Sequence, residues 1–270
     1  MKSKNISIYG SGSFGTALAV SCLRANQNVT LITRQPEVAS QLAEQRCNHR
    51  YLPEIILPNS LNITTNLTVL KSSDLILLAT PAQSLFDVLT DLKPYLDQKC
   101  PVILCAKGID RQHQMLLSDV AKQQIANPIA LLSGPSFAIE IAQNHPTAVM
   151  LAADSLDLAI DLSKALRHAN FRCYATDDIV GIQVAGAVKN VIAIASGIVY
   201  GRSFGMNTRA ALLSRGLAEM CRLGLAMGAK QETFLGLAGT GDLILTGTSD
   251  LSRNFRFGKI WGETLSREKT

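Results

Sequence analysis

Aromatic and charged residues are scarce in this sequence. Of its 270 residues, 5% are aromatic and 17% are charged, and there is a single tryptophan. So few aromatic side chains disfavour a surface on which nucleic-acid bases could stack. Lysine and arginine are scattered, so the net charge of +5 suits small anionic ligands better than a nucleic acid. We therefore expect no nucleic-acid partner.

Metal-binding patterns are missing as well. The six cysteines form no CxxC pair and have no Cys/His spacing suited to zinc, which predicts no metal site and reduced, mostly buried thiols in a cytoplasmic protein. The N-terminal MKSKNISIYG leads directly into a strand-like segment, so we expect no signal peptide. The longest apolar stretch, residues 181–201, is interrupted by Lys189 and Asn190, so we also expect no integral membrane segment.

The chain has enough apolar residues, 47%, for a large core. Short apolar runs alternate with amphipathic segments over the first two-thirds, which predicts a mainly parallel sheet covered by helices on both faces. The runs are at 6–10, 29–33, 75–80, 102–106, 129–133, 148–152 and 171–175, and the helical candidates at 14–25, 36–46, 82–92, 114–126 and 155–168. After residue 178 only long helices are expected. The predicted fold is α/β, with a Rossmann-like domain at 1–178 and an all-α domain at 179–270.

A glycine-rich motif follows the first predicted strand. Residues 10–15 read GSGSFG, with Gly10, Gly12 and Gly15 in a GxGxxG pattern and Ser11, Ser13 and Phe14 between them. The first glycine permits a tight turn, the second a close approach of pyrophosphate, and the third close packing of helix on strand. The motif predicts a dinucleotide site at a helix N-terminus. The alternative is a merely structural glycine-rich turn.

The end of the second strand bears on which dinucleotide binds. NAD enzymes usually carry an acidic residue there for the ribose, but here Thr33 and Arg34 follow the strand. A guanidinium can bind a 2′-phosphate, so we expect NADP to be preferred, with NAD possible. Alternatively, Arg34 is a solvated loop residue and both cofactors are used.

Further candidate polar residues lie after predicted strands and in a glycine-rich stretch near the C-terminus. Lys107 follows the strand at 102–106, where ligands bind in open α/β sheets, although it could be surface decoration. In SGPSFAIE (133–140), Gly134 and Pro135 form a turn and Ser136 is placed to cap or begin a helix. A glycine-rich stretch at 237–254 brings together Asp242, Thr246, Ser252, Arg253 and Asn254. An Arg-Asn pair suits a phosphate, but Asp242 and Arg253 could simply pair with each other.

Lys189 has only small or apolar helix neighbours, namely Ala185, Gly186, Ile192 and Ala193. One interpretation is a lysine that snorkels to the surface from a core helix. The other is a lysine for proton transfer, since a dry environment lowers its pKa toward working pH. Asp242, if paired with it, would raise that pKa, and the sequence leaves open which effect is larger. Asn190 could orient Lys189 or hold a substrate hydroxyl.

Together the motifs resemble the bacterial type of NAD(P)-dependent glycerol-3-phosphate dehydrogenase. The matching segments cover nearly the whole chain in order: GSGSFGTALA, RYLP, AKG, SGPSFAIE, VAGAVKNVIAIASG, NTRAAL, AGTGDLILT and SRN. The resemblance implies a cytoplasmic homodimer that interconverts dihydroxyacetone phosphate and sn-glycerol 3-phosphate for phospholipid synthesis. It implies Lys189 as the proton-transfer residue.

The resemblance also implies the residues that surround each ligand. Around the substrate would lie Lys107, Gly134, Ser136, Asp242, Ser252, Arg253 and Asn254. Along the cofactor would lie Ser11, Phe14, Arg34, Lys107, Ala138 and Arg253. Members of the family run about 60 residues further, so the C-terminal part of the helical domain is expected to be missing here. Competing interpretations are another reductase of the same plan, an NADP-binding redox sensor without catalysis, and a structural protein with an accidental fingerprint.

Overall fold

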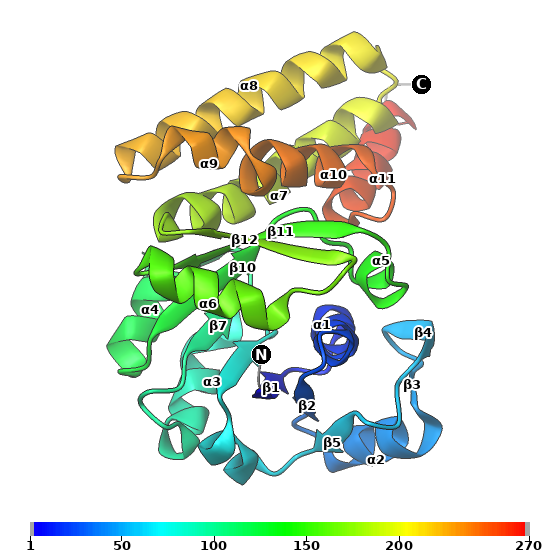
Figure 1. Ribbon diagram of the computed structural model, residues 1–270. Helices are drawn as coiled ribbons and strands as arrows, with labels where there is room; N and C mark the ends of the chain where they lie inside the picture. Colours follow the sequence, from blue (N-terminus) through cyan, green and yellow to red (C-terminus); the bar gives the residue numbers. More distant parts are fainter. Residues whose placement is uncertain (1–2, 268–270) are drawn as a thin grey trace. The chain divides into compact units, whose positions relative to one another are not determined.

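The computed structural model describes residues 3–267. It contains two compact units (Figure 1). The first comprises Met1–Leu132 and Ser136–Asp177, and the second comprises Ser133–Pro135 and Asp178–Thr270. The short Ser133–Pro135 turn therefore packs with the helices of the second unit, although the chain on both sides of it belongs to the first.

The first unit is built on an eight-stranded sheet. In spatial order its strands are β12 (Phe171–Thr176), β11 (Thr147–Ala153), β10 (Ile129–Ser133), β7 (Val102–Leu104), β6 (Leu75–Leu78), β1 (Asn5–Tyr9), β2 (Asn28–Ile32) and β5 (Asn62–Thr64). The pairs β1–β2, β1–β6, β2–β5, β6–β7, β7–β10 and β11–β12 are parallel. The expected mainly parallel sheet is confirmed.

The strand sequences explain their place in the middle of the unit. All four residues of β6 are leucine or isoleucine and at most 1% exposed, as expected for a strand covered on both faces. The covering helices are α1 (Ser13–Arg24), α2 (Pro36–Gln45), α3 (Leu85–Leu92), α4 (Leu117–Gln124), α5 (Ala138–Ala142) and α6 (Leu156–Leu166). The chain proceeds outward from β1 in one direction through β2 and β5, and in the other through β6, β7 and β10. The loop after β1 thus lies at the topological switch point, where such sheets bind ligands.

Three features of this unit differ from the sequence prediction. The edge strand β5 and the hairpin of β3 (Cys47–Asn48) and β4 (Leu52–Ile56) were not expected. The helix predicted at 114–126 covers only Leu117–Gln124, because Met115 and Leu116 form strand β9, which pairs with β8 (Ile109–Asp110). These strands are two to five residues long, and none contains a continuous apolar run like those that identified the strands of the main sheet.

The second unit is helical. Its elements are α7 (Ile179–Gly201), α8 (Gly205–Ala226), α9 (Gln231–Leu235), a π-helical turn (Leu237–Gly241), α10 (Asp242–Thr248) and α11 (Arg253–Arg267). Helix α7 contacts all the others. Its length and composition would allow it to cross a membrane, but 61% of its most apolar window is buried within the structure, which is typical of a core helix.

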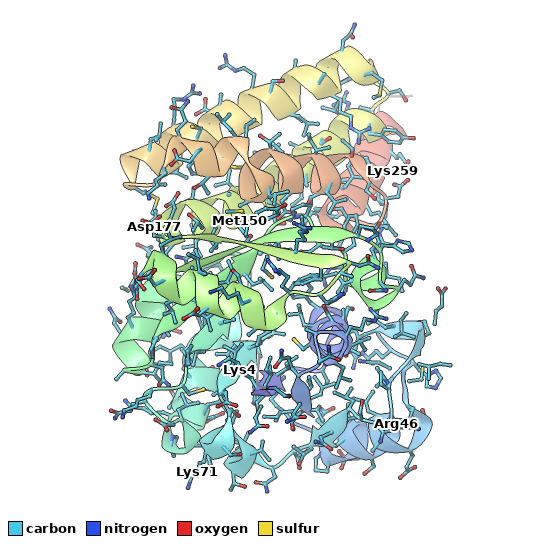
Figure 2. All side chains as sticks on the ribbon, in the orientation of Figure 1. Lys4, Arg46, Lys71, Met150, Asp177 and Lys259 are labelled. Atoms are coloured by element: carbon cyan, nitrogen blue, oxygen red, sulfur yellow. The ribbon has the colours of Figure 1, made fainter. Side chains whose placement is uncertain are left out.

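Glycines allow α7 and α11 to approach closely. A Cβ on Gly197 would lie 2.7 Å from the backbone nitrogen of Lys259, and one on Gly262 would lie 3.0 Å from the Cα of Ile198. Lys259, labelled in Figure 2, extends from α11 and places its Nζ 4.9 Å from the Tyr200 ring centroid. Gly197 on α7 and Gly262 on α11 therefore serve close packing of the two helices.

Candidate active site

Lys189 lies at the centre of a buried polar cluster in the helical unit. Its side chain is 7% exposed and forms an ion pair with Asp242, which is 1% exposed. Lys189 Nζ also donates a hydrogen bond to Thr246 Oγ1 at 2.8 Å. The snorkelling interpretation is therefore wrong, since the amine is held inside the unit.

Helix α10 supplies both partners because of their spacing. Asp242 and Thr246 are four residues apart, so they share the face of α10 that meets α7. Thr246 Oγ1 lies 3.2 Å from Asp242 Oδ1 and can donate to it while it accepts from Lys189. The carboxylate stabilises the ammonium form of the lysine and so opposes the effect of burial. Asp242 pairs with Lys189, and the alternative of an Asp242–Arg253 pair is not observed.

Asn190, the next residue on α7, connects this helix to the start of α11. Asn254 Nδ2 donates to Asn190 Oδ1 at 2.8 Å, and Asn190 Nδ2 donates to the carbonyl of Gly186 at 3.1 Å. Both groups of the Asn190 amide are thus oriented by protein contacts.

The N-terminus of α11 has the features of an anion site. Ser252 is buried, and its Oγ accepts a hydrogen bond from the Phe255 backbone N–H at 3.2 Å, as an N-cap does. Arg253 and Asn254 occupy the first turn, and Arg253 is exposed. The positive end of the helix dipole and the guanidinium both favour a negatively charged group here.

The glycine-rich loop in the first unit has the geometry that a dinucleotide needs. Gly10 has φ 110°, and a Cβ there would lie 2.6 Å from the Ala79 carbonyl oxygen. A Cβ on Gly15 would overlap the Gly10 carbonyl oxygen, whereas one on Gly12 would have nothing within 4 Å. Close contacts within the protein therefore require glycine at positions 10 and 15. At position 12 the space where a Cβ would lie is open.

The helix that follows the loop presents free donors. Helix α1 begins at Ser13 with Gly12 as N-cap, and no side chain caps it. Phe14 is partly buried against the hydrophobic core. Uncapped N–H groups at a helix start bind phosphate oxygens. A Gly12 open to one side and an uncapped α1 fit a bound pyrophosphate.

Other predicted residues follow strands of the same sheet. Arg34 is exposed after β2, and its charge partly offsets the burial that raises the pKa of Tyr9. Lys107 is half-buried in the loop after β7, and Gly134 is buried after β10 with φ 134°. Ala138 is the first residue of α5.

The prediction that Ser136 caps or begins a helix is wrong. The N-cap of α5 is Phe137, which is extended at φ −67° and ψ 128°, and no side chain caps the helix. Ser136 therefore lies before the helix, in the segment that leaves the Gly134–Pro135 turn.

Two buried residues near these sites were not predicted from the sequence as site residues. Arg209 on α8 donates to the Gly247 carbonyl at 2.9 Å and to Ser196 Oγ at 3.2 Å, with its guanidinium 4.8 Å from the Phe255 ring centroid. Asn48 in the β3–β4 hairpin donates to the Ser11 carbonyl. Asn48 stands in none of the motifs, and NTRAAL, which contains Arg209, supports the resemblance without indicating that the arginine is buried.

Comparison with known proteins finds a protein family whose models match most of this chain. Residues 5–159 match the model of the N-terminal part of NAD-dependent glycerol-3-phosphate dehydrogenase, and residues 178–270 match the C-terminal part. Glycerol-3-phosphate dehydrogenase [NAD(P)+] of Zymomonas mobilis is 46% identical over 98% of this chain and 77% of its own length. The enzyme of the same name from Paramagnetospirillum magneticum is 44% identical over 96% of this chain and 94% of its own.

A solved structure of a glycerol-3-phosphate dehydrogenase is also similar to this chain. The glycerol-3-phosphate dehydrogenase of Coxiella burnetii superimposes with a TM-score of 0.92 at 40% identity, over 99% of this chain and 84% of that one. The likeness therefore extends over both units of the chain.

Proposed function

The chain belongs to the NAD-dependent glycerol-3-phosphate dehydrogenase family, and from that membership we infer that it is an oxidoreductase interconverting dihydroxyacetone phosphate and sn-glycerol 3-phosphate with NAD(P)H. The observation that carries the inference is the buried cluster of Lys189, Asp242 and Thr246 in a chain that also has an open glycine-rich loop. Together they offer a proton carrier and a dinucleotide site.

The loop after β1 would hold the cofactor. Gly10, Ser11, Gly12, Ser13, Phe14 and Gly15 form it, and the N–H groups at the start of α1 would meet the pyrophosphate. When bound, the nicotinamide supplies or accepts hydride at C2 of the substrate. Lys107, Ala138 and Arg253 are proposed to line the cofactor as well.

We propose that NADP is preferred over NAD. Arg34 supports this preference because it is exposed directly after β2, where the ribose of a dinucleotide is read, and no carboxylate stands there.

Lys189 is the proposed proton-transfer residue. In the direction of reduction, the oxygen on C2 gains negative charge and takes a proton from the ammonium. In oxidation the neutral amine receives a proton from the C2 hydroxyl. Asp242 and Thr246 hold the amine in place, and Asp242 keeps it protonated until the negative charge develops.

The substrate phosphate is proposed to bind at the start of α11. Arg253 supplies charge, and Ser252 and Asn254 define the first turn of the helix. Binding energy far from C2 serves to hold the carbonyl in place. Lys107, Gly134, Ser136 and Asn190 are proposed to complete the substrate site.

We propose a homodimer and a cytoplasmic location. The dimer is supported by apolar side chains on the surface of α11, where Phe257 is 58% and Ile260 64% exposed. The location is supported by six free cysteines. Light scattering on the purified chain would test the dimer, and a mass of 29.0 kDa would contradict it.

The decisive experiment measures oxidation of NADPH, and separately of NADH, after addition of dihydroxyacetone phosphate. We expect turnover, with far less when unphosphorylated dihydroxyacetone is added instead. Equal rates with both compounds would favour another reductase of the same plan. Binding of NADPH without any turnover would favour a redox sensor.

A further inference from the structure

We propose that Asn48 is a positioning residue for the cofactor, one that orients the Ser11–Gly12 peptide of the glycine-rich loop toward the pyrophosphate. The proposal rests on the function proposed above and adds to it a residue outside the glycine motif. Asn48 touches the loop from a hairpin that is distant in sequence, and it acts only through the loop.

Asn48 contacts both the loop and the helix that follows it. Asn48 Nδ2 donates to the Ser11 carbonyl oxygen at 2.9 Å and to Thr16 Oγ1 at 2.8 Å. Asn48 is 5% exposed and Thr16 is fully buried. Thr16 Oγ1 in turn lies 3.4 Å from the same Ser11 oxygen. One amide group therefore joins the loop to the first turn of α1.

Because the peptide is planar, the contact with the Ser11 carbonyl also fixes the direction of the Gly12 N–H. In a trans peptide the C=O and the following N–H point in opposite directions. Because Asn48 and Thr16 hold the Ser11 carbonyl on the buried side, the Gly12 N–H must point to the other side. A Cβ on Gly12 would meet nothing within 4 Å, so an approaching anion has room there. Asn48 thus keeps one loop donor directed at the place where pyrophosphate would bind.

The hairpin that carries Asn48 is itself firmly held. The Tyr51 N–H donates to the Asn48 carbonyl at 3.0 Å, and the Leu57 N–H donates to that of Arg46 at 2.7 Å. Arg46, labelled in Figure 2, donates from Nη1 to the Leu61 carbonyl at 2.9 Å. The hairpin also contributes Leu52 to the hydrophobic core. Asn48 therefore has a fixed position from which it can restrain the loop.

The substitution Asn48→Asp tests the role without changing the shape of the side chain. A carboxylate cannot donate, so its oxygens would face the Ser11 carbonyl and repel it. The Ser11–Gly12 peptide should then rotate and remove the Gly12 N–H from the cofactor side. Asn48→Ala removes the same donors without adding a charge near the pyrophosphate, and so separates loss of orientation from electrostatic repulsion.

A second asparagine provides a matched control. Asn127 is 6% exposed, and its Nδ2 likewise donates to two oxygens, the carbonyls of Asp97 at 2.7 Å and Cys100 at 2.8 Å. It supports the turn before β7 and is not in contact with the glycine-rich loop. Asn127→Asp and Asn127→Ala should therefore lower the melting temperature as the Asn48 variants do, but leave cofactor binding unchanged.

The experiment measures NADPH and NADH binding by fluorescence titration, together with steady-state kinetics and melting temperature, on the full chain. For both Asn48 variants we expect the dissociation constant and the KM of the dinucleotide to rise by about fivefold or more, the effect of losing the hydrogen bond that orients the loop peptide. The kcat at saturating dinucleotide and the KM of dihydroxyacetone phosphate should change by less than about twofold.

Two results would overturn the proposal: unchanged dinucleotide binding in the Asn48 variants, or an equal rise in the Asn127 variants. If the Asn48 variants do not fold, Thr16→Val tests the proposal instead, since it removes the hydroxyl that contacts Asn48 and the Ser11 carbonyl but preserves the shape of the side chain. It should weaken dinucleotide binding by about twofold or more, and unchanged binding would contradict the proposal. Failure of the wild-type chain to bind any dinucleotide would instead refute the proposed function, so the two failures are distinguishable.

Discussion

Replacement of Lys189 by alanine gives the sharpest test of the active-site assignment. The change removes the ammonium that contacts Asp242 and Thr246, and so breaks the ion pair of a carboxylate whose side chain is only 1% exposed. Two separate effects follow, one on catalysis and one on stability. The helices and the glycine-rich loop of the first unit are not touched, so dinucleotide binding should persist.

The catalytic effect follows from the loss of the proton carrier. Removal of a general acid lowers turnover by about 100-fold or more, which corresponds to about 2.7 kcal/mol in the activation free energy. The stability effect follows from the broken ion pair. Removing one partner of a buried pair costs about 3–5 kcal/mol, so the melting temperature should fall by roughly 10 °C.

The assay must separate these effects. We would measure kcat at saturating NADPH and dihydroxyacetone phosphate well below the melting temperature of the variant, and NADPH binding by fluorescence. Gly201→Ala is the matched control on the same helix, because its Cβ would collide with the backbone of α11 at Lys259 and Glu263, beyond the first turn, and destabilise the packing by about 1–3 kcal/mol. The control should keep its turnover. Near-normal kcat in folded Lys189→Ala, or an equal loss in the control, would refute the assignment.

Three further outcomes are expected. Arg34→Ala should raise the KM of NADPH by about tenfold, the loss of a charge-assisted contact, and leave that of NADH unchanged; an equal change for both would remove Arg34 from cofactor selection. Arg253→Ala should raise the KM of dihydroxyacetone phosphate by about tenfold or more, with unphosphorylated dihydroxyacetone unaffected, and an unchanged KM would move the phosphate site elsewhere. Burial raises the pKa of the Cys22 thiol to about 12 from 9.0, so its contribution to stability is complete below pH 9 and is lost as pH rises toward 12; melting curves from pH 8 upward should show a smaller loss in Cys22→Ala than in the wild type.

The sequence predicted the first βα unit well because its signals are local. A short apolar run, the turn requirement of Gly10 and the small residues of α1 lie within about twenty consecutive positions, and each limits the backbone directly. The long helices α7 and α8 were likewise predicted, since their length exceeds any strand. Short segments such as β5 and the β3–β4 hairpin were missed, because they lack the continuous apolar run that identified equally short strands of the main sheet.

The side-chain partners were less predictable. Lys189 and Asp242 are 53 positions apart, and Asn48 and Ser11 are 37 apart. From the sequence, Asp242 could have paired with Lys189 or with Arg253. In the structure it pairs with Lys189, because α10 presents Asp242 and Thr246 on the face that meets α7. Asn48 stood in no motif that marked it as buried.

The sequence by itself therefore determined the main alternation of strands and helices, the long helices after residue 178, the glycine-rich loop and the presence of a lysine in an apolar helix. Only the tertiary structure decided that this lysine is buried against a carboxylate, that Arg209 is buried beside the Phe255 ring, and that an asparagine from a hairpin holds the loop. The physical reason is that periodicity and turn chemistry act between near neighbours in the chain. A hydrogen bond inside a folded unit depends on which faces of distant elements come together, and that is decided by packing.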